Sequence, residues 1–213
     1  MIFQKVLKGI VGIDQSAAQQ RLDGAGITCN WWRAINPLPF SEIPERLTEQ
    51  NVLWHLSNYD QIDPTTGLLF GERTPFISAT AGTVERDAYL AMNFVHSAFV
   101  TAMAFATDNF QRDGAIFYGY VTVLGKKALI HQEFAEETRD LNLFHAYQPF
   151  HPEGEIVAKI AIPSPRLEKV EGYNGNAALQ DWRAGRWPRP SWTINNPNYA
   201  RPEDYSNVRE AII

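Results

Sequence analysis

The 213-residue sequence contains a single cysteine, Cys29, so no disulfide can form within the chain. A lone cysteine without an activating neighbour is typical of a small buried residue. Basic residues are also scarce, with 19 Lys and Arg against 24 Asp and Glu, for a net charge of −5. This balance excludes nucleic-acid binding through overall charge, although not through a local basic patch. Because disulfides are rare in reducing compartments, their absence favours a cytosolic site of action.

The sequence also lacks the short motifs that mark common nucleotide and hydrolase sites. It has neither the glycine-rich loop of Rossmann and P-loop domains nor the nucleophile elbow of α/β-hydrolases. His131, His145 and His151 do not show the paired spacing of zinc ligands. We therefore expect no metal site, and no nucleotide bound in the Rossmann manner.

One uncharged stretch is long enough to cross a bilayer. It runs from Ala88 to Thr107 without Asp, Glu, Lys or Arg. It nevertheless contains Asn93 and His96 and is rich in alanine. We expect a buried amphipathic helix over residues 84–107, and no membrane span.

The remaining composition fits one folded domain. Hydrophobic residues make up 45% of the chain and charged residues 20%, which is ordinary for a folded protein, and the length is sufficient for a real core. Apolar, β-branched runs bounded by Pro, Gly and Asp predict strands over 27–33, 75–80, 115–124 and 156–162. We predict an α+β domain over 27–171, after a helical lead-in (1–26) and before an irregular Trp-, Pro- and Arg-containing tail (172–213) packed on the domain.

Three polar features lie on or beside these strands. Arg33 ends the first strand, and Ser78 and Thr80 alternate along the second, so they share one face of it. Glu153 and Glu155 stand one residue apart at the mouth of the last apolar run, and they also face the same way if the strand begins at Glu153. A loop that hands paired carboxylates to a core strand suits charge-stabilising chemistry.

In this order, the features resemble the ADP-ribosyltransferase toxins of the cholera and pertussis type. The segments that carry the resemblance are Trp32-Arg33-Ala34 before Pro37, Asn51-Val52-Leu53-Trp54-His55-Leu56, Phe76-Ile77-Ser78-Ala79-Thr80 and His151-Pro152-Glu153-Gly154-Glu155-Ile156. They look like the family's aromatic–arginine segment, its active-site histidine segment, its Ser-Thr-Ser strand and its final glutamate loop. The similarity extends over residues 27–175.

The resemblance implies two small, mostly antiparallel sheets packed around an NAD cleft, with flanking helices. It also implies a mono-ADP-ribosyltransferase, a glycosyltransferase that cleaves the nicotinamide–ribose bond of NAD and transfers ADP-ribose to an acceptor. The transition state of this reaction resembles an oxocarbenium ion, so a fixed carboxylate, here Glu155, would stabilise it. Glu153 would orient and help deprotonate the acceptor. In the family, a Glu at this place goes with arginine acceptors, so the expected partner is a protein arginine.

The other implied site residues bind NAD or hold Glu155. Arg33 would bind the diphosphate bidentately, as a lysine cannot. Ser78 would hold Glu155 and the nicotinamide ribose, Thr80 would stiffen the same face, and His55 would contact the adenosine ribose or a phosphate. The expected NAD-binding residues are Trp32, Arg33, Ala34, His55, Ser78, Thr80, Tyr147 and Glu155, with Phe150 as a second candidate for stacking on the nicotinamide.

Alternative interpretations stay open. The tail carries Trp182, Trp187 and Trp192 among arginines, which would suit ADP-ribosylation of a nucleic acid, or simply packing of the tail on the domain. A non-catalytic interaction domain on the same scaffold is a third interpretation, against which the intact Glu155 argues. The expected setting is a bacterial virulence effector delivered into another cell, or an intracellular toxin held by an antidote. A chaperone or delivery partner is compatible with both.

Overall fold

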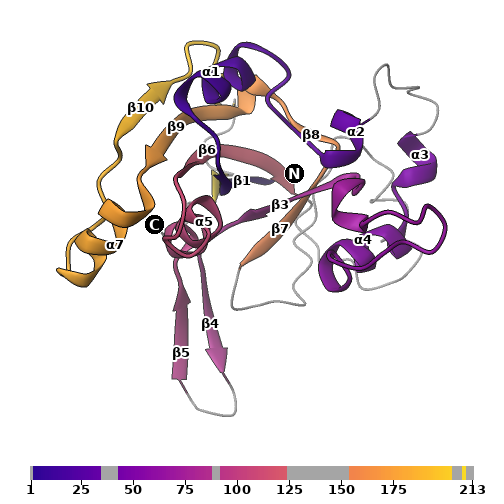
Figure 1. Ribbon diagram of the computed structural model, residues 1–213, viewed down its shortest axis with the longest axis horizontal. Coiled ribbons are helices and arrows are strands. Elements are labelled where there is room, and N and C mark those ends of the chain that lie inside the picture. The colour runs from indigo at the N-terminus through magenta and orange to yellow at the C-terminus, as the bar shows by residue number, and fades with distance from the viewer. Residues whose placement is uncertain (1, 35–42, 88–91, 124–153, 203–207, 210–213) are drawn as a thin grey trace.

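The structure is a computed structural model that describes residues 2–34, 43–87, 92–123, 154–202 and 208–209. The strands are β1 (Ile2–Val11), β2 (Ile27–Thr28), β3 (Phe76–Thr80), β4 (Thr83–Asp87), β5 (Met92–His96), β6 (Gly114–Val123), β7 (Glu155–Lys159), β8 (Ala161–Ile162), β9 (Leu167–Tyr173), β10 (Trp192–Asn195) and β11 (Val208–Arg209). The helices are α1 (Gln15–Asp23), α2 (Asn30–Ala34), α3 (Ile43–Arg46), α4 (Glu49–Ser57), α5 (Ala98–Thr107) and α7 (Gly175–Arg183), with 3-10 turns at Phe70–Glu72 and Ser164–Arg166. The predicted α+β class, with mostly antiparallel sheets and flanking helices, is confirmed (Figure 1).

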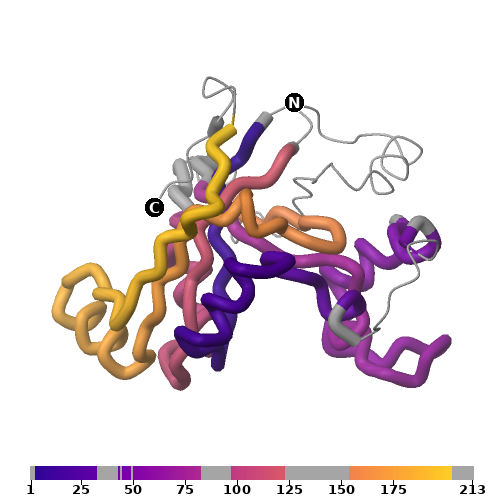
Figure 2. The backbone as a smooth tube through the Cα atoms, turned by 90° about the horizontal axis from the view of Figure 1, so that it is seen from above, coloured from indigo at the N-terminus to yellow at the C-terminus, as the bar shows by residue number. Residues whose placement is uncertain are grey.

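The main sheet has the strand order β10-β9-β6-β1-β3-β7, with β11 added parallel to β1. It divides into a four-stranded half-sheet (β10, β9, β6 and β1) and a two-stranded half-sheet (β3 and β7). β1 pairs with β6 along all ten of its residues, and β3 pairs with β7 along all five. Between β1 and β3 there is one pair, Leu7 with Thr80. Beyond that pair the two half-sheets are not hydrogen-bonded as a ladder, and Figure 2 shows them diverging in the view from above.

Both faces of the four-stranded half-sheet are covered. On one face α5 packs against Leu7 and Ile116 in an apolar cluster. The approach is close, because a Cβ at Gly9 would lie 2.1 Å from the carbonyl oxygen of Ala102. On the other face, Val6 belongs to the main core cluster with the buried residues of α1 and α4. The helices thereby fix the position of β1 from both sides.

The predicted helical lead-in over residues 1–26 is wrong for its first half. Ile2–Val11 is strand β1, and the helix is limited to Gln15–Asp23. The apolar pairs of this stretch recur every four residues, at Ile2-Phe3, Val6-Leu7 and Ile10-Val11, which imitates a helical period. A strand covered on both faces also needs apolar residues on both, so strict alternation is lost.

The predicted helix over residues 84–107 is also wrong in its first half, which forms the hairpin strands β4 and β5. The helix α5 begins after Ser97, whose hydroxyl accepts a hydrogen bond from the Val100 N–H as an N-cap. The predicted strand over 27–33 is limited to Ile27–Thr28, and the residues after Cys29 turn into α2. β3 and β6 confirm the strands predicted over 75–80 and 115–124.

The predicted irregular tail contains regular elements in its described part. The end of β9, helix α7 and strand β10 all lie beyond residue 171, and β10 pairs with β9. The tail does pack on the domain, since Trp187 stacks on Phe99 of α5 with ring centroids 4.7 Å apart. Trp192 packs against the main core cluster.

Candidate functional site

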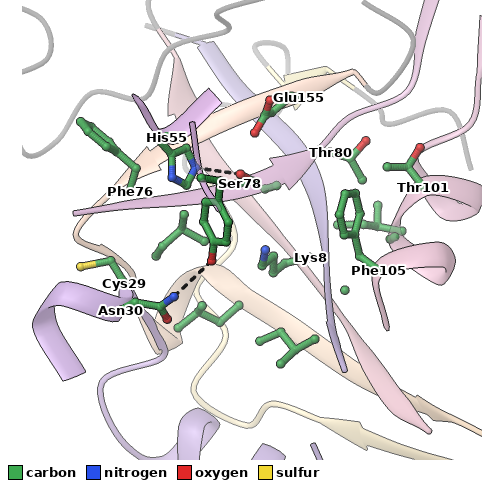
Figure 3. Close-up of a pocket in the computed structure, with 18 of the residues that line it drawn as sticks. Lys8, Cys29, Asn30, His55, Phe76, Ser78, Thr80, Thr101, Phe105 and Glu155 are labelled. Atoms are coloured by element: carbon green, nitrogen blue, oxygen red, sulfur yellow. Dashed lines mark hydrogen bonds between the residues drawn. The ribbon is translucent and has the colours of Figure 1, made fainter. Parts of the chain in front are cut away.

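A cavity of about 560 Å³ lies where the two half-sheets separate. Its walls include residues 7–11 of β1 and 76–80 of β3, so both parities of each strand contribute. This pattern is expected for a cavity that runs through the opening between two strands rather than over one face of a sheet. α4 and α5 supply further wall residues, and the segment 27–30 closes one end (Figure 3).

His55 of α4 reaches this cavity and links two hydroxyl groups. Its Nε2 lies 2.8 Å from Ser78 Oγ, and its Nδ1 lies 2.8 Å from Thr74 Oγ1. The side chain is 5% exposed. Burial, and to a smaller extent the positive charge of Lys8, lowers the pKa of His55 to about 3. The imidazole is therefore neutral at neutral pH.

The hydrogen bonds of Thr74 assign the tautomer of His55. The Phe76 N–H donates to Thr74 Oγ1, and the hydroxyl of Thr74 is buried. Since a buried hydroxyl proton needs an acceptor, we assign it to His55 Nδ1, which places the imidazole proton on Nε2. Nε2–H then donates to Ser78 Oγ, and the hydroxyl proton of Ser78 remains available to the cavity.

Glu155, the first residue of β7, lies beside this chain of hydrogen bonds. It pairs directly with Thr80, and Ser78 pairs with Val157, two residues further along β7. Directly opposed residues in an antiparallel ladder point to the same face, so Ser78, Thr80 and Glu155 share one face of the two-stranded half-sheet. Figure 3 shows Glu155 above Ser78 at the cavity, with Thr80 to the right of both, toward Thr101.

Two cations and a tyrosine complete the described walls. Lys8 of β1 points into the middle of the cavity in Figure 3, and Arg21 of α1 also lines it. Tyr59 follows α4 and packs edge-on against His55, with ring centroids 5.7 Å apart. Asn30 holds this corner, because its Nδ2 donates to Tyr59 Oη at 3.2 Å and to the Gly71 carbonyl oxygen at 2.6 Å.

The structure therefore brings together four of the residues predicted from the sequence, namely His55, Ser78, Thr80 and Glu155. Their roles in binding and catalysis stay predictions. His55 differs from its predicted place, since both ring nitrogens are engaged by hydroxyl groups of the protein itself and not left for the adenosine ribose or a phosphate.

Of the other predicted site residues, Trp32 does not line the cavity, and the side chains of Arg33 and Ala34 lie outside what the structure describes. Arg33 and Ala34 belong to helix α2 and not to a strand. Trp32 of the same helix packs against the main core cluster. Glu153, Tyr147 and the stacking candidate Phe150 lie outside the described residues.

Several residues that line the cavity, or that hold a lining residue in place, were missed by the sequence reasoning. Lys8 lay in the stretch interpreted as a helical lead-in, although a lysine within an apolar run was itself a signal. Thr74 precedes Pro75 at the start of a predicted strand, and nothing local marks it as a partner of His55. Thr101 and Phe105 of α5 line the far wall, where only the tertiary packing of the helix places them.

The described residues offer neither a membrane-spanning helix nor a cluster of metal ligands. None of the helices there is long and apolar enough to span a bilayer. No group of three or more His, Cys, Asp or Glu side chains there is arranged to hold a metal ion.

The fold and cavity describe an α+β protein with a cleft at the split of an antiparallel sheet. No protein-family model and no curated protein matches the sequence. Among solved structures, the chain is similar to one named EcPltA, with 10% sequence identity and a TM-score of 0.47, over 98% of this chain and 93% of that chain. At this identity and score, the likeness does not assign the chain to a family.

Proposed function

We propose that the protein is a mono-ADP-ribosyltransferase that cleaves the nicotinamide–ribose bond of NAD and transfers ADP-ribose to arginine of a target protein. One observation carries the proposal. Glu155 shares a face with Ser78 and Thr80 at a cavity of about 560 Å³, and His55 holds Ser78 there by a 2.8 Å hydrogen bond. A carboxylate with hydroxyl groups beside it, in a cleft of ligand size, suits stabilisation of a positively charged sugar.

The proposed reaction breaks the bond between ribose C1′ and the nicotinamide nitrogen. The electron pair of that bond leaves with nicotinamide, which becomes neutral, and positive charge develops over C1′ and the ring oxygen. Glu155 opposes this charge from a fixed position, which is worth more in a partly enclosed site than in water. The charge exists only in the transition state, so the interaction accelerates the chemical step.

Ser78 and Thr80 serve to hold the reacting groups. The tautomer assigned to His55 leaves the Ser78 hydroxyl proton free to donate toward Glu155 or a ribose hydroxyl. Because His55 stays neutral, it does not add a charge of its own beside the developing cation. We therefore assign His55 a positioning role in this reaction rather than a direct contact with NAD.

The acceptor nitrogen then attacks C1′ and forms the new glycosidic bond. An arginine acceptor must lose one proton from its guanidinium, and we assign that proton to Glu153, two residues before Glu155 in the chain. A carboxylate at this place also attracts a cationic acceptor. The proposed setting is a cytosol, entered by a delivered effector or containing an intracellular toxin with its antidote.

The test is incubation of the purified protein with NAD labelled in its adenylate part and a cell lysate. The proposal predicts label on lysate proteins and release of nicotinamide. Glu155→Gln should lower both by about 100- to 1,000-fold, the loss expected for one electrostatic group aimed at the transition state. Glu153→Gln should lower transfer more than NAD hydrolysis, because water can attack through a lone pair and lose its proton afterwards, whereas a guanidinium must lose a proton before its nitrogen can attack.

Glu168→Gln provides the matched control, because Glu168 is an exposed residue of β9 that does not line the cavity. It should leave both reactions unchanged. Nuclease treatment of the labelled product separates a protein acceptor from a nucleic acid. An unlabelled lysate together with no nicotinamide release would contradict the proposal.

A further inference from the structure

The cavity has charged wall residues besides Glu155 that the proposed reaction does not use. Among its described wall residues the cations are Lys8 and Arg21, and the acids are Asp60 and Glu155. Lys8 belongs to β1, Arg21 to α1, and Glu155 to β7 on the other side of the split. A ligand that reaches from Glu155 across the split to β1 therefore passes from a carboxylate to the ammonium group of Lys8.

The register of the strands sets the position of Lys8 relative to Glu155. Glu155 pairs with Thr80, Thr80 pairs with Leu7, and Lys8 follows Leu7. Neighbouring strands lie about 4.8 Å apart, so the backbones of Glu155 and Leu7 are about 10 Å apart. Lys8 is the first residue of β1 past the bridge between the half-sheets, where β1 no longer has β3 as a neighbour in the ladder.

The side chain of Lys8 extends into this opening. Figure 3 shows it directed into the cavity below Ser78, and it is half-buried. Its charge is felt at His55, whose protonation it disfavours. An ammonium group is a compact charge with three donors on a flexible stem, which suits phosphate oxygens whose position varies slightly.

We propose that Lys8 binds the diphosphate of NAD at the opening between the half-sheets, with the nicotinamide ribose held at Glu155 and Ser78. This inference rests on the proposed function and adds a residue for substrate binding that the resemblance to the toxin family does not supply. It assigns the diphosphate cation to β1, whereas the sequence interpretation gave that role to Arg33. Lys8 is a binding residue with the same contact before and during bond cleavage.

The test compares Lys8→Met with Lys5→Met. Lys5 is the matched control, because it lies on the same strand, pairs with Tyr120 of β6 and does not line the cavity. The binding of ADP-ribose, which keeps the diphosphate but has no bond to cleave, is measured by calorimetry. The KM and kcat for NAD hydrolysis are measured in parallel.

Lys8→Met should weaken ADP-ribose binding by about 10- to 100-fold, the loss expected for a hydrogen bond to a charged group. It should raise the KM for NAD by a similar factor and leave kcat nearly unchanged, because the contact is equal in the ground and transition states. Lys5→Met should leave all three values as in the wild type. Lys8→Arg should retain most of the affinity, since it keeps the charge.

Two further results separate the failure of this inference from failure of the function. If the wild type binds ADP-ribose and hydrolyses NAD while Lys8→Met matches Lys5→Met, the assignment of Lys8 is wrong and the proposed function stands. If the wild type neither binds ADP-ribose nor releases nicotinamide, the proposed function itself fails. Should Lys8→Met not fold, Lys8→Gln replaces it, and wild-type affinity in that variant would equally overturn the assignment.

Discussion

The two halves of the main sheet are built differently. The four-stranded half-sheet has long ladders, is covered on both faces, and allows backbone contact with α5 at Gly9. The two-stranded half-sheet is short, is joined to the first by the single pair Leu7–Thr80, and carries Ser78, Thr80 and Glu155. The candidate site residues therefore lie where the hydrogen-bond ladder between β1 and β3 is interrupted, because an interrupted ladder leaves room for a ligand between the strands.

A substitution that breaks the four-stranded half-sheet should have the largest effect on stability. In Gly9→Ala the added Cβ would lie 2.1 Å from the carbonyl oxygen of Ala102, which is backbone and cannot move aside cheaply. We expect the free energy of unfolding to fall by about 3 kcal/mol, measured by guanidinium titration. Gly67→Asn serves as control, because Gly67 has a left-handed φ of 69° that asparagine tolerates and has nothing within 4 Å of its Cβ position. A stability of Gly9→Ala equal to that of the wild type would contradict this packing.

A substitution in the two-stranded half-sheet should instead affect activity. Ser78→Ala removes the hydroxyl that His55 directs toward the cavity. We expect kcat for NAD hydrolysis to fall by about 10- to 100-fold, since a hydrogen bond to the charged Glu155 or to the ribose is lost. Ser16→Ala, an exposed serine of α1, is the control and should not change kcat. A wild-type kcat in Ser78→Ala would show that the hydroxyl group of Ser78 does not contribute to catalysis.

Two buried threonines allow the site and the helix α5 to be compared directly, because the hydroxyl group of each makes two hydrogen bonds inside the protein. Thr74 donates to His55 and accepts from the Phe76 N–H, while Thr107 of α5 donates to the Met103 carbonyl oxygen and accepts from the Phe110 N–H. Each change to Val should lower the free energy of unfolding by about 1 to 3 kcal/mol, because one partner is left unsatisfied.

Only Thr74→Val should also lower kcat for NAD hydrolysis, because only Thr74 donates the hydrogen bond that fixes the imidazole proton of His55 on Nε2. Thr74→Ser should restore kcat, since serine keeps the hydroxyl. Equal kcat values in Thr74→Val and Thr107→Val would show that Thr74 acts in folding alone.

His55 predicts a pH dependence of stability. Its pKa is 6.5 in an unfolded chain and about 3 in the folded protein, where burial disfavours the charged form. Between these values the unfolded state binds one more proton, so this group stabilises the fold above pH 6.5 and its contribution falls as the pH is lowered toward 3. The loss amounts to about 1.4 kcal/mol per pH unit.

The difference in free energy of unfolding between the wild type and His55→Gln isolates this contribution. This difference should be largest at pH 7.5 and shrink steadily below pH 6, measured by denaturant titration at each pH. A difference that is constant between pH 7.5 and 5 would show that His55 titrates normally in the folded protein.

Sequence reasoning succeeded where local pattern and tertiary environment agree. β3 and β6 are runs of apolar, aromatic and β-branched residues that lie inside the sheet, so their identity as strands is visible in the sequence. β1 was mistaken because it is covered on both faces, and its apolar pairs imitate a helix. The hairpin of β4 and β5 was mistaken because Thr83, Glu85 and Asp87 of β4 imitate the start of a helix, and the uncharged residues of β5 continue into α5 without a turn signal.

The candidate site shows the same limit. Ser78, Thr80 and Glu155 share a face through alternation and strand pairing, which the sequence pattern made predictable. The role of Thr74 depends on the docking of α4, which leaves no local signal. The role of Lys8 depends on the split between β1 and β3, of which its place within an apolar run is the single local sign. Arg33 lies in a helix because the strand ends at Thr28 and α2 begins at Asn30, a boundary that propensity did not reveal.

The central claim is that the opening between the half-sheets is an NAD site with Glu155 at the bond that breaks. The most direct measurement is a crystal structure of the Glu155→Gln variant with NAD, because this change preserves shape while slowing cleavage. We predict the nicotinamide ribose within about 3 Å of the side chain at position 155, the distance of a hydrogen bond, and the diphosphate beside Lys8. NAD bound elsewhere on the protein, or an empty cavity at a concentration of NAD at which the wild type hydrolyses it, would contradict the account.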